Sequence, residues 1–152
     1  AAGYKNIIVS RTASKIHGLA GLRIGFGYSH PDIVHEMSWR KTGDTHVLGL
    51  EAAHASYLDQ EFQNFSIRKN KESRTIVENM CEQLRLRYIK SNTNFMFIQT
   101  GMKNSFVQAK MNEVGILTGR DFPPYHTSWT RISMSKPEEM EYFVQVYKRL
   151  FG

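Results

Sequence analysis

The 152 residues of this chain, 41% of them hydrophobic and 22% charged, can build one compact domain or two small ones, which excludes a disordered or low-complexity protein. The single cysteine, Cys81, excludes a disulfide framework and a cysteine-based zinc cluster. The sequence shows neither a signal peptide nor an apolar run of roughly 20 residues, so we expect a cytoplasmic protein with no membrane contact. The 20 basic and 14 acidic side chains give a net charge of +6, which makes nucleic-acid binding a hypothesis to be weighed.

Two strands are predicted near the start of the chain. Residues 6–12 have an apolar middle, which is typical of a strand buried on both faces. Residues 22–29 alternate between large apolar side chains and arginine, glycine or serine, which predicts a second strand. The glycines on its polar side allow another group to approach the backbone closely. The loop between the strands, residues 13–21, is longer than a simple hairpin needs.

Three helices are predicted in the middle of the chain. The first runs over about 31–41, where proline suits the first turn, and the second over about 46–59, where Asp44 or Thr45 can act as the cap. The third covers roughly 61–86 and carries an apolar stripe with four-residue spacing. Its length is suited to a connector between two structural units.

The last third of the chain is predicted to form a small α+β unit. Its expected elements are strands at 94–99, 116–120 and 129–135, with helices over 105–114 and from 136 to 150. Ser135 is predicted to cap the final helix, with Glu138 as its capping-box partner.

The densest basic run, residues 68–74, is also interpreted as part of a helix. It contains Glu72 and has a helical pattern, and such runs are usually a solvated helix face. We therefore expect no nucleic-acid partner. A site for a small anionic molecule is another explanation for the excess of arginine.

Two hydroxyl groups and two cationic side chains gather around the loop between the predicted strands. They belong to Thr12, Ser14, Lys15 and Arg23. Hydroxyls, backbone amides and an arginine fork are the groups that bind a phosphate monoester. A lysine near a second cation and partly desolvated loses its proton more readily, and it can then attack a carbonyl to form a Schiff base. The residue types alone also allow Lys15 to be a surface loop lysine and Arg23 an edge-strand arginine.

A long motif spans this loop, where residues 10–25 read Ser-Arg-Thr-Ala-Ser-Lys-Ile-His-Gly-Leu-Ala-Gly-Leu-Arg-Ile-Gly. It closely resembles the cofactor-lysine segment of fold-type I aminotransferases, which use pyridoxal 5'-phosphate (PLP). The order of later motifs agrees, with Thr-Asn-Phe at 93–95, Trp-Thr-Arg-Ile-Ser at 129–133 and Pro-Glu-Glu-Met at 137–140. The resemblance is nearest to the class I/II, histidinol-phosphate aminotransferase-like group, and it covers essentially the whole chain.

The resemblance implies a role for each residue of the cluster. Lys15 is expected to form the Schiff base with PLP and to move a proton between substrate and cofactor. Thr12, Ser14 and Arg23 are expected to hold the cofactor phosphate. Arg131 matches the arginine that receives the substrate α-carboxylate, for which a planar fork is well suited. The alternative for Arg131 is a surface strand residue, although it shares a polar strand face with Trp129 and Ser133.

Two further positions are interpreted with alternatives left open. Arg120 lies where members of the group that act on phosphorylated substrates often carry an arginine, so it either meets the distal anionic end of a substrate or pairs with Asp121 or another neighbour. His17 either lines the mouth of the pocket or is a simple loop histidine. The remaining histidines show no metal-ligand spacing, so no metal is expected.

The resemblance also implies the domain organisation and the fold class. The expected fold is α/β with an α+β small domain: residues 1–60 are the C-terminal remainder of a large PLP-binding domain, and residues 61–152 are a long connecting helix and a small C-terminal domain. In the family, a preceding segment supplies the carboxylate that pairs with the pyridine nitrogen and the aromatic residue that stacks on the ring. We therefore expect the isolated chain to be inactive and the intact protein to be a homodimer.

The predicted function is PLP-dependent transfer of an amino group between an amino acid, or an amino-alcohol phosphate such as histidinol phosphate, and a 2-oxo acid. Three alternatives stay open at this point: a PLP-dependent lyase or decarboxylase of the same fold, a catalytically silent homologue, and a non-catalytic basic module that binds nucleic acid or an acidic protein.

Overall fold

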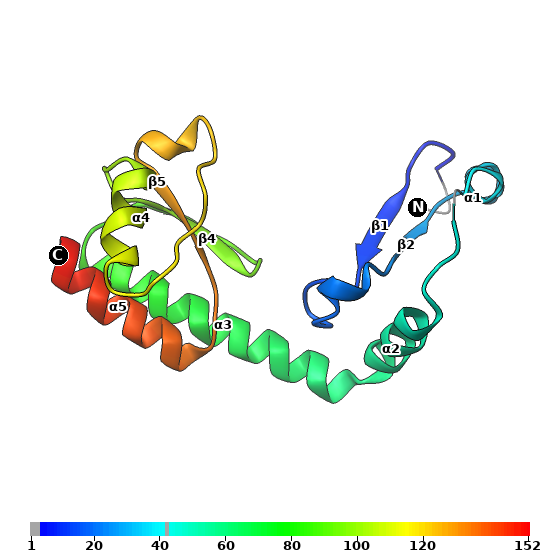
Figure 1. Cartoon of the computed structure of the whole chain (residues 1–152), viewed down its shortest axis with the longest axis horizontal. Helices are drawn as coiled ribbons and strands as arrows, with labels where there is room; N and C mark the ends of the chain where they lie inside the picture. Colours follow the sequence, from blue (N-terminus) through cyan, green and yellow to red (C-terminus); the bar gives the residue numbers. More distant parts are fainter. Residues whose placement is uncertain (1–3, 42) are drawn as a thin grey trace. The chain divides into compact units, whose positions relative to one another are not determined.

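The structure is a computed structural model that describes residues 4–41 and 43–152 (Figure 1). It mixes helices and short strands, as expected for an α/β fold. The chain divides into two compact units, Ala1–Ser66 and Ile67–Gly152, and the boundary falls inside helix α3 (Gln60–Gln83). Across the described residues, no helix is both long and apolar enough to span a membrane.

The first unit contains a two-stranded antiparallel ribbon and helices. Its elements are strand β1 (Val9–Thr12), the 3-10 turn η1 (Ala20–Leu22), strand β2 (Gly25–Tyr28) and helices α1 (Pro31–Trp39) and α2 (Val47–Leu58). The ribbon pairs Val9 with Tyr28 and Thr12 with Gly25, and Ala13 N extends the pairing by donating to Ile24 O at 3.0 Å.

The expectation that the first strand is buried on both faces is wrong. All four residues of β1 are exposed, and Ile8 just before it is 52% exposed. In the described residues β2 is the only strand paired with β1, and the small core of this unit lies beyond the end of the ribbon. That core is formed by Ala13, Ile24 and Ala53, with Leu19, Leu22 and Tyr57 packed against it.

Helix α2 packs closely against Ile24. A Cβ built on Gly49 would lie 2.9 Å from the Ile24 side chain, so this helix position accepts only glycine without a shift. The cap of α2 differs from the prediction of Asp44 or Thr45, because the helix begins at Val47 and the cap position therefore falls on His46. The Nδ1 atom of His46 accepts a hydrogen bond from Gly49 N at 3.1 Å.

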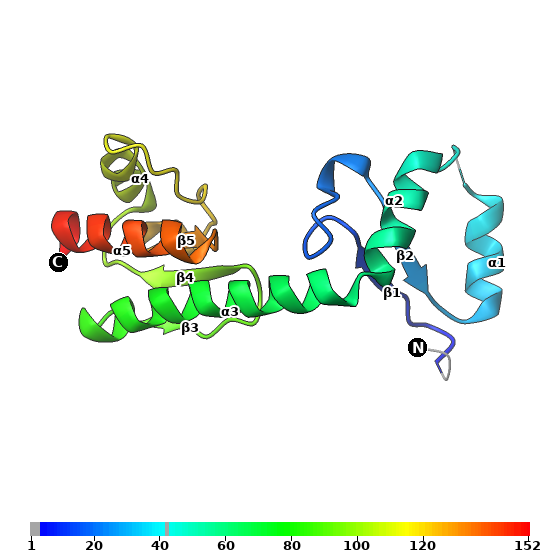
Figure 2. The ribbon, with the colours of Figure 1, turned by 90° about the horizontal axis from the view of Figure 1, so that it is seen from below.

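The second unit is a three-stranded antiparallel sheet covered by helices. It comprises most of α3, strands β3 (Tyr88–Ile89), β4 (Phe95–Gln99) and β5 (Trp129–Ser133), helices α4 (Asn104–Asn112) and α5 (Pro137–Phe151), and the 3-10 turn η2 (Tyr125–Thr127). The order in the sheet is β3-β4-β5, with Phe97 opposite Arg131. Helices α3 and α5 run alongside each other (Figures 1 and 2), and Lys148 Nζ of α5 donates to Gln83 Oε1 of α3 at 2.5 Å.

Burial alternates along the two longer strands of this sheet. Met96 and Ile98 of β4 and Thr130 and Ile132 of β5 are buried, whereas Arg131 lies on the other, half-buried face. The buried side chains pack with residues of all three helices, namely Val77, Met80 and Cys81 of α3, Val107 and Met111 of α4, and Met140, Phe143, Val146 and Tyr147 of α5. The predicted alternation of the last strand is therefore confirmed.

Two predictions for this unit are wrong, and one short strand has no predicted counterpart. Residues 116–120 form no strand, because Gly119 O accepts from the side chains of Asn104 and Gln108 and only Gly119 N bonds to β5. Ser135 does not cap α5: the helix begins at Pro137, and the Ser135 hydroxyl donates to the Glu139 carboxylate. The short strand β3 is not among the predicted elements, since two residues carry too little alternation to be recognised.

Candidate functional site

The loop that carries Lys15 is closed by its own backbone. Leu19 N donates to Ala13 O and Gly18 N donates to Lys15 O, both at 2.9 Å. Ala13 is fully buried, whereas Lys15 is exposed. The buried alanine therefore anchors the loop, and the closed turn presents Lys15 outward.

Two hydroxyls lie directly before this lysine. Thr12 Oγ1 donates to Ser14 Oγ at 2.7 Å, and Ser14 N donates to Thr12 Oγ1 at 3.1 Å. This local turn holds the two oxygen atoms on one side of the chain, at the end of β1. An anion that replaced the hydroxyl–hydroxyl contact would meet two O–H donors and nearby backbone N–H groups.

Arg23 reaches the same end of the ribbon from the other strand. The bond from Ala13 N to Ile24 O places Arg23 one residue beyond the paired part of the ribbon, at the end where Ser14 follows Ala13. Arg23 has a left-handed backbone with φ of 53°, and its Nη1 donates to Ala20 O at 2.8 Å, so part of the guanidinium is held by η1. The structure thus joins Thr12 to Ser14 by hydrogen bonds beside Lys15 and places Arg23 at the same end of the ribbon, with its side chain held by Ala20 O. Within the described residues, neither Lys15 nor Arg23 forms an ion pair.

A glycine keeps the two strands close at this point. A Cβ built on Gly25 would lie 2.7 Å from Arg11 O, which is backbone and cannot move aside easily. This explains why the polar face of the second predicted strand carries glycine.

His17 connects the lysine loop to α2. It is only 7% exposed, its Nδ1 lies 2.9 Å from Ser56 Oγ, and its ring centroid lies 3.9 Å from that of Tyr57. It is therefore a buried anchor of the loop and not a simple loop histidine, and its place at the mouth of a cofactor pocket stays a prediction. The sequence carries no signal for this contact, which joins residues 39 positions apart.

Arg131 lies on the sheet of the second unit, between aromatic rings. Its Cζ is 4.0 Å from the ring centroid of Phe95 and 5.2 Å from that of Phe122. Its Nε is buried and has no hydrogen-bond partner among the residues described. The guanidinium is therefore fixed by stacking, and its donors are not used by the unit itself.

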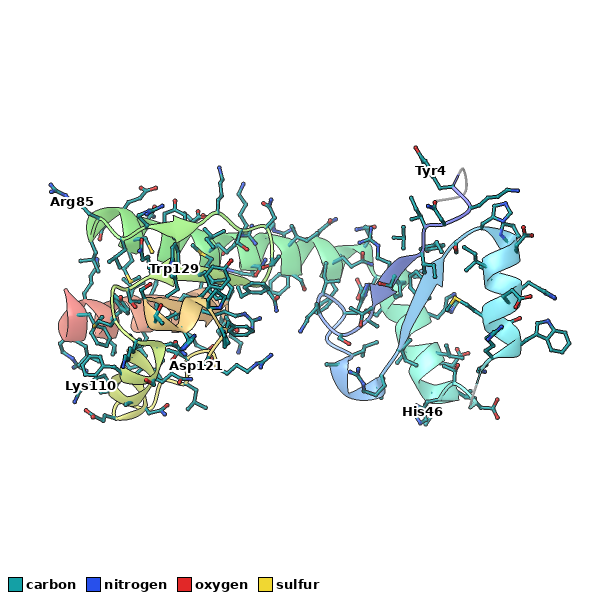
Figure 3. All side chains as sticks on the ribbon, turned by 90° about the horizontal axis from the view of Figure 1, so that it is seen from above. Tyr4, His46, Arg85, Lys110, Asp121 and Trp129 are labelled. Carbon is teal, nitrogen blue, oxygen red and sulfur yellow. The ribbon has the colours of Figure 1, made fainter. Side chains whose placement is uncertain are left out.

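Arg120 is exposed and stacks on the same Phe122 ring, with its Cζ 4.7 Å from the centroid. The expected alternative, an ion pair with Asp121 or a neighbour, does not occur in the part of the chain that the structure describes. Asp121, labelled in Figure 3, instead accepts a hydrogen bond from Asn104 Nδ2 at 2.7 Å.

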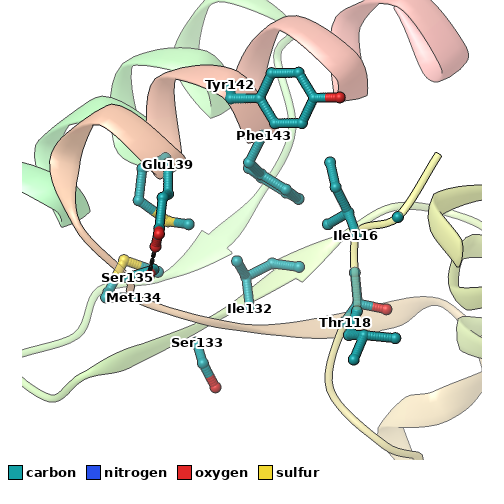
Figure 4. Close-up of a pocket in the computed structure, with 12 residues that line it drawn as sticks. Ile116, Thr118, Ile132, Ser133, Met134, Ser135, Glu139, Tyr142 and Phe143 are labelled. Atoms are coloured by element: carbon teal, nitrogen blue, oxygen red, sulfur yellow. Dashed lines mark hydrogen bonds between the residues drawn. The ribbon is translucent and has the colours of Figure 1, made fainter.

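A pocket of about 440 Å³ lies in the second unit but does not include either arginine (Figure 4). It is bounded by residues 115–118, the end of β5 and α5, and its lining includes Ile132, Phe143 and the hydrogen-bonded pair Ser135 and Glu139. Ile132 lies on the face of β5 opposite to that of Arg131, and neither Arg120 nor Arg131 lines the pocket.

The described residues contain no cluster of three or more metal-ligating side chains. The one cysteine is not a nucleophile: burial is the main reason that the pKa of the Cys81 thiol is raised to about 12, and Glu78 and Glu82 add to the effect. The chemistry available is therefore that of a lysine, hydroxyl donors and guanidinium groups, in two clusters, one in each unit.

Comparison with known proteins finds one family that matches nearly the whole chain. Residues 1–146 match the family model of the aminotransferase class I and II proteins. Histidinol-phosphate aminotransferase 1 of Idiomarina loihiensis is 30% identical over 154 residues, covering 98% of this chain and 41% of the relative. Histidinol-phosphate aminotransferase of Akkermansia muciniphila is 32% identical over 151 residues, covering 96% and 40%. The chain thus spans about two fifths of the length of these relatives.

Solved structures agree with these matches. A candidate histidinol-phosphate aminotransferase from Erwinia carotovora atroseptica has a TM-score of 0.92 at 36% identity, covering 97% of this chain and 43% of that chain. Histidinol-phosphate aminotransferase from Sinorhizobium meliloti, solved with pyridoxal 5'-phosphate, has a TM-score of 0.79 at 28% identity, covering 96% and 42%. Because the family model matches all but the last six residues, this chain belongs to the aminotransferase class I and II family.

Proposed function

We propose that this chain is part of a PLP-dependent aminotransferase and that its first unit holds the cofactor. The observation that carries the proposal is the hydrogen-bonded Thr12–Ser14 pair beside Lys15, with Arg23 at the same end of the ribbon. Hydroxyl, backbone N–H and guanidinium donors are suited to a phosphate monoester, and an exposed lysine next to them is suited to an aldehyde. The residues present therefore fit PLP, the group found in the Sinorhizobium meliloti relative.

Each residue has a distinct role in this proposal. Thr12, Ser14 and Arg23 hold the phosphate, and Lys15 supplies the amine that attaches the cofactor. When bound, PLP supplies an electron-withdrawing ring that stabilises negative charge on the substrate α-carbon. Once the substrate amine has replaced it on the cofactor, the freed Lys15 Nζ would be placed to take the proton from that carbon and, in the reverse half of the transfer, to return a proton to the product carbon.

The second unit is proposed to recognise the substrate. Arg131 receives the α-carboxylate, which its planar fork can bind through two parallel hydrogen bonds. Arg120 meets the distal anionic end. We propose that the donor is an amino acid or an amino-alcohol phosphate such as histidinol phosphate, and that the acceptor is a 2-oxo acid. The names of the relatives and the presence of two stacked arginines in one unit support this substrate class.

Decarboxylation by the same fold is the alternative reaction. L-Threonine-O-3-phosphate decarboxylase from Porphyromonas gingivalis shares the fold at 19% identity and a TM-score of 0.81. We favour amino transfer because relatives that are 30% and 32% identical to this chain are named histidinol-phosphate aminotransferases.

A basic binding module is also less consistent with the structure. Within the basic run 68–74, Lys69 pairs with Glu72 at 2.9 Å, and Asn70 and Arg74 donate to Thr93 O at 3.2 and 3.0 Å. These side chains thus serve the fold of the second unit, which leaves a weaker cationic surface for an acidic partner.

Further polypeptide is proposed to cover the first unit in the intact enzyme. Trp39, Leu48 and Leu58 are 77%, 72% and 71% exposed, which is unfavourable in water. We propose that the whole enzyme is a cytoplasmic homodimer and that the 152-residue chain alone is inactive. Light scattering of the full-length enzyme checks the dimer.

An isotope-transfer assay tests the function. The full-length polypeptide that contains this chain is loaded with PLP and given a 15N-labelled amino donor and a 2-oxo acid. Transfer of 15N to the acceptor is expected, and Lys15→Ala should abolish it. Lys41→Ala serves as the control, because Lys41 is an exposed lysine outside the cluster. Release of carbon dioxide without 15N transfer would instead identify a decarboxylase.

A further inference from the structure

Arg120 and Arg131 stack on one aromatic ring. Their Cζ atoms lie 4.7 Å and 5.2 Å from the Phe122 ring centroid. The two guanidinium groups are therefore separated by about 10 Å at most, since each is within cation–π range of the same centre. A single small molecule with two anionic groups can span such a separation.

Phe122 is itself held firmly. Its ring centroid lies 5.6 Å from that of Phe97, with the planes at 83°, and Phe97 lies opposite Arg131 in the sheet. An edge-to-face contact of this kind fixes both the position and the tilt of a ring. The ring that the two arginines share therefore packs against the sheet through Phe97.

The backbone leading to Phe122 is also fixed. Asn104, which is 1% exposed, donates its Nδ2 to Gly119 O at 3.1 Å and to Asp121 Oδ1 at 2.7 Å. Gly119 N donates to Arg131 O at 3.0 Å. These bonds hold the residues on both sides of Arg120, and one of them joins that segment directly to the residue that carries the second guanidinium.

We propose that Phe122 is a positioning residue that holds Arg120 and Arg131 as one receptor for a ligand with two anionic groups. This rests on the proposed function in that it concerns the substrate arginines of the same enzyme. Ordering a long arginine side chain costs conformational entropy at the moment of binding, and a shared ring removes part of that cost in advance.

The structure predicts different effects on the two arginines. Arg131 also stacks on Phe95 at 4.0 Å, whereas Phe122 is the ring on which Arg120 stacks in the described chain. Loss of the Phe122 ring should therefore leave Arg131 partly ordered and release Arg120.

The test uses the 152-residue chain, with succinate as a probe that has two carboxylates and acetate as a probe that has one. Affinities are measured by NMR from the side-chain Nε–Hε signals of Arg120 and Arg131. In Phe122→Leu, acetate affinity should fall about two- to fivefold and succinate affinity about five- to thirtyfold, because one stacked contact is lost for acetate and two are lost for succinate.

Two matched variants keep the result interpretable. Phe122→Tyr retains the ring and should bind both probes within about twofold of the original chain. Phe106→Leu removes a half-exposed phenylalanine of α4 and should change neither affinity. An equal loss for succinate and acetate in Phe122→Leu, or failure of Phe122→Tyr to retain binding, would overturn the proposal. Because no PLP is present in these titrations, their outcome is independent of the isotope-transfer assay on Lys15.

Discussion

Replacing Gly119 with alanine should loosen the segment that carries Arg120. A Cβ at this position would lie 2.5 Å from Arg131 O and 3.1 Å from Arg131 Cβ, both on the strand that the segment contacts. A carbon atom normally stays about 3.3 Å or more from a carbonyl oxygen, so the segment must move by nearly 1 Å. Such a shift lengthens the 3.0 Å bond from Gly119 N to Arg131 O.

The cost can be stated as a free energy of unfolding. Overpacking of this kind costs about 1–3 kcal/mol, and a lost backbone hydrogen bond costs about 1 kcal/mol more. For a unit of this size, a loss of about 2 kcal/mol or more should lower the Tm by at least 8 °C or so. Circular dichroism during heating of the 152-residue chain measures the shift.

Gly21→Ala is the matched control, because a Cβ built on Gly21 meets nothing within 4 Å. Its Tm should stay within about 2 °C of that of the original chain. An unchanged Tm in Gly119→Ala would refute the reasoning, since it would mean that the segment is not held against β5.

Three further predictions concern the site and the core. Arg23→Ala in the full-length enzyme should weaken the affinity for PLP about ten- to a hundredfold, because a charge-assisted bond to the phosphate is lost. Equilibrium dialysis measures this affinity, and an unchanged value would contradict the role proposed for Arg23. Arg131→Ala should raise the KM for alanine, glutamate and the 2-oxo acids, which carry the carboxylate that Arg131 is proposed to receive, and it should affect histidinol phosphate, which has no α-carboxylate, least. Arg120→Ala should raise the KM for glutamate and histidinol phosphate and spare alanine. Equal effects of Arg120→Ala on all three donors would contradict this division. Burial raises the pKa of Cys81 from about 9.0 to about 12, so the folded state disfavours the thiolate. The contribution of the protonated thiol to the free energy of unfolding is therefore complete below pH 9 and is lost as the pH rises toward 12. Urea unfolding between pH 8 and pH 11 measures this loss, and Cys81→Ala should weaken the pH dependence.

The elements that the sequence predicts best are those whose pattern is local. Period-two alternation correctly places Arg131 on the half-buried face of β5 and Ile132 on the core face. Proline at the first helical position correctly marks the start of α1 at Pro31. In both elements the residues that decide the structure lie within a few positions of each other.

The errors arise where distant parts of the chain decide the outcome. The apolar run before Thr12 was expected to be buried, but burial requires neighbours that the described residues do not provide. Residues 116–120 have strand-like composition, yet the side chains of Asn104 and Gln108 take the Gly119 carbonyl that a strand would need. No local pattern announces such competition.

The candidate site also differs between residues predicted from a local motif and residues whose partners are distant in the sequence. A motif of 16 consecutive positions, residues 10–25, predicts Thr12, Ser14, Lys15 and Arg23 as the cofactor site, because all four candidates lie within it. Phe122 and His17 were not recognised as anchors, since their partners lie elsewhere in the sequence: Phe97 in β4 and Ser56 in α2. Candidate binding residues can thus be predicted from their type and spacing, whereas the residues packed against them are found only in the fold.

Covalent mapping of the cofactor tests the central claim most directly. The full-length enzyme loaded with PLP is reduced with borohydride, digested and examined by mass spectrometry for a pyridoxyl group on lysine. The account predicts the pyridoxyl group on Lys15, at the turn beside Thr12 and Ser14, and its loss in Lys15→Arg but not in Lys41→Arg. A pyridoxyl group on another lysine, or none in an enzyme shown to contain PLP, would contradict it.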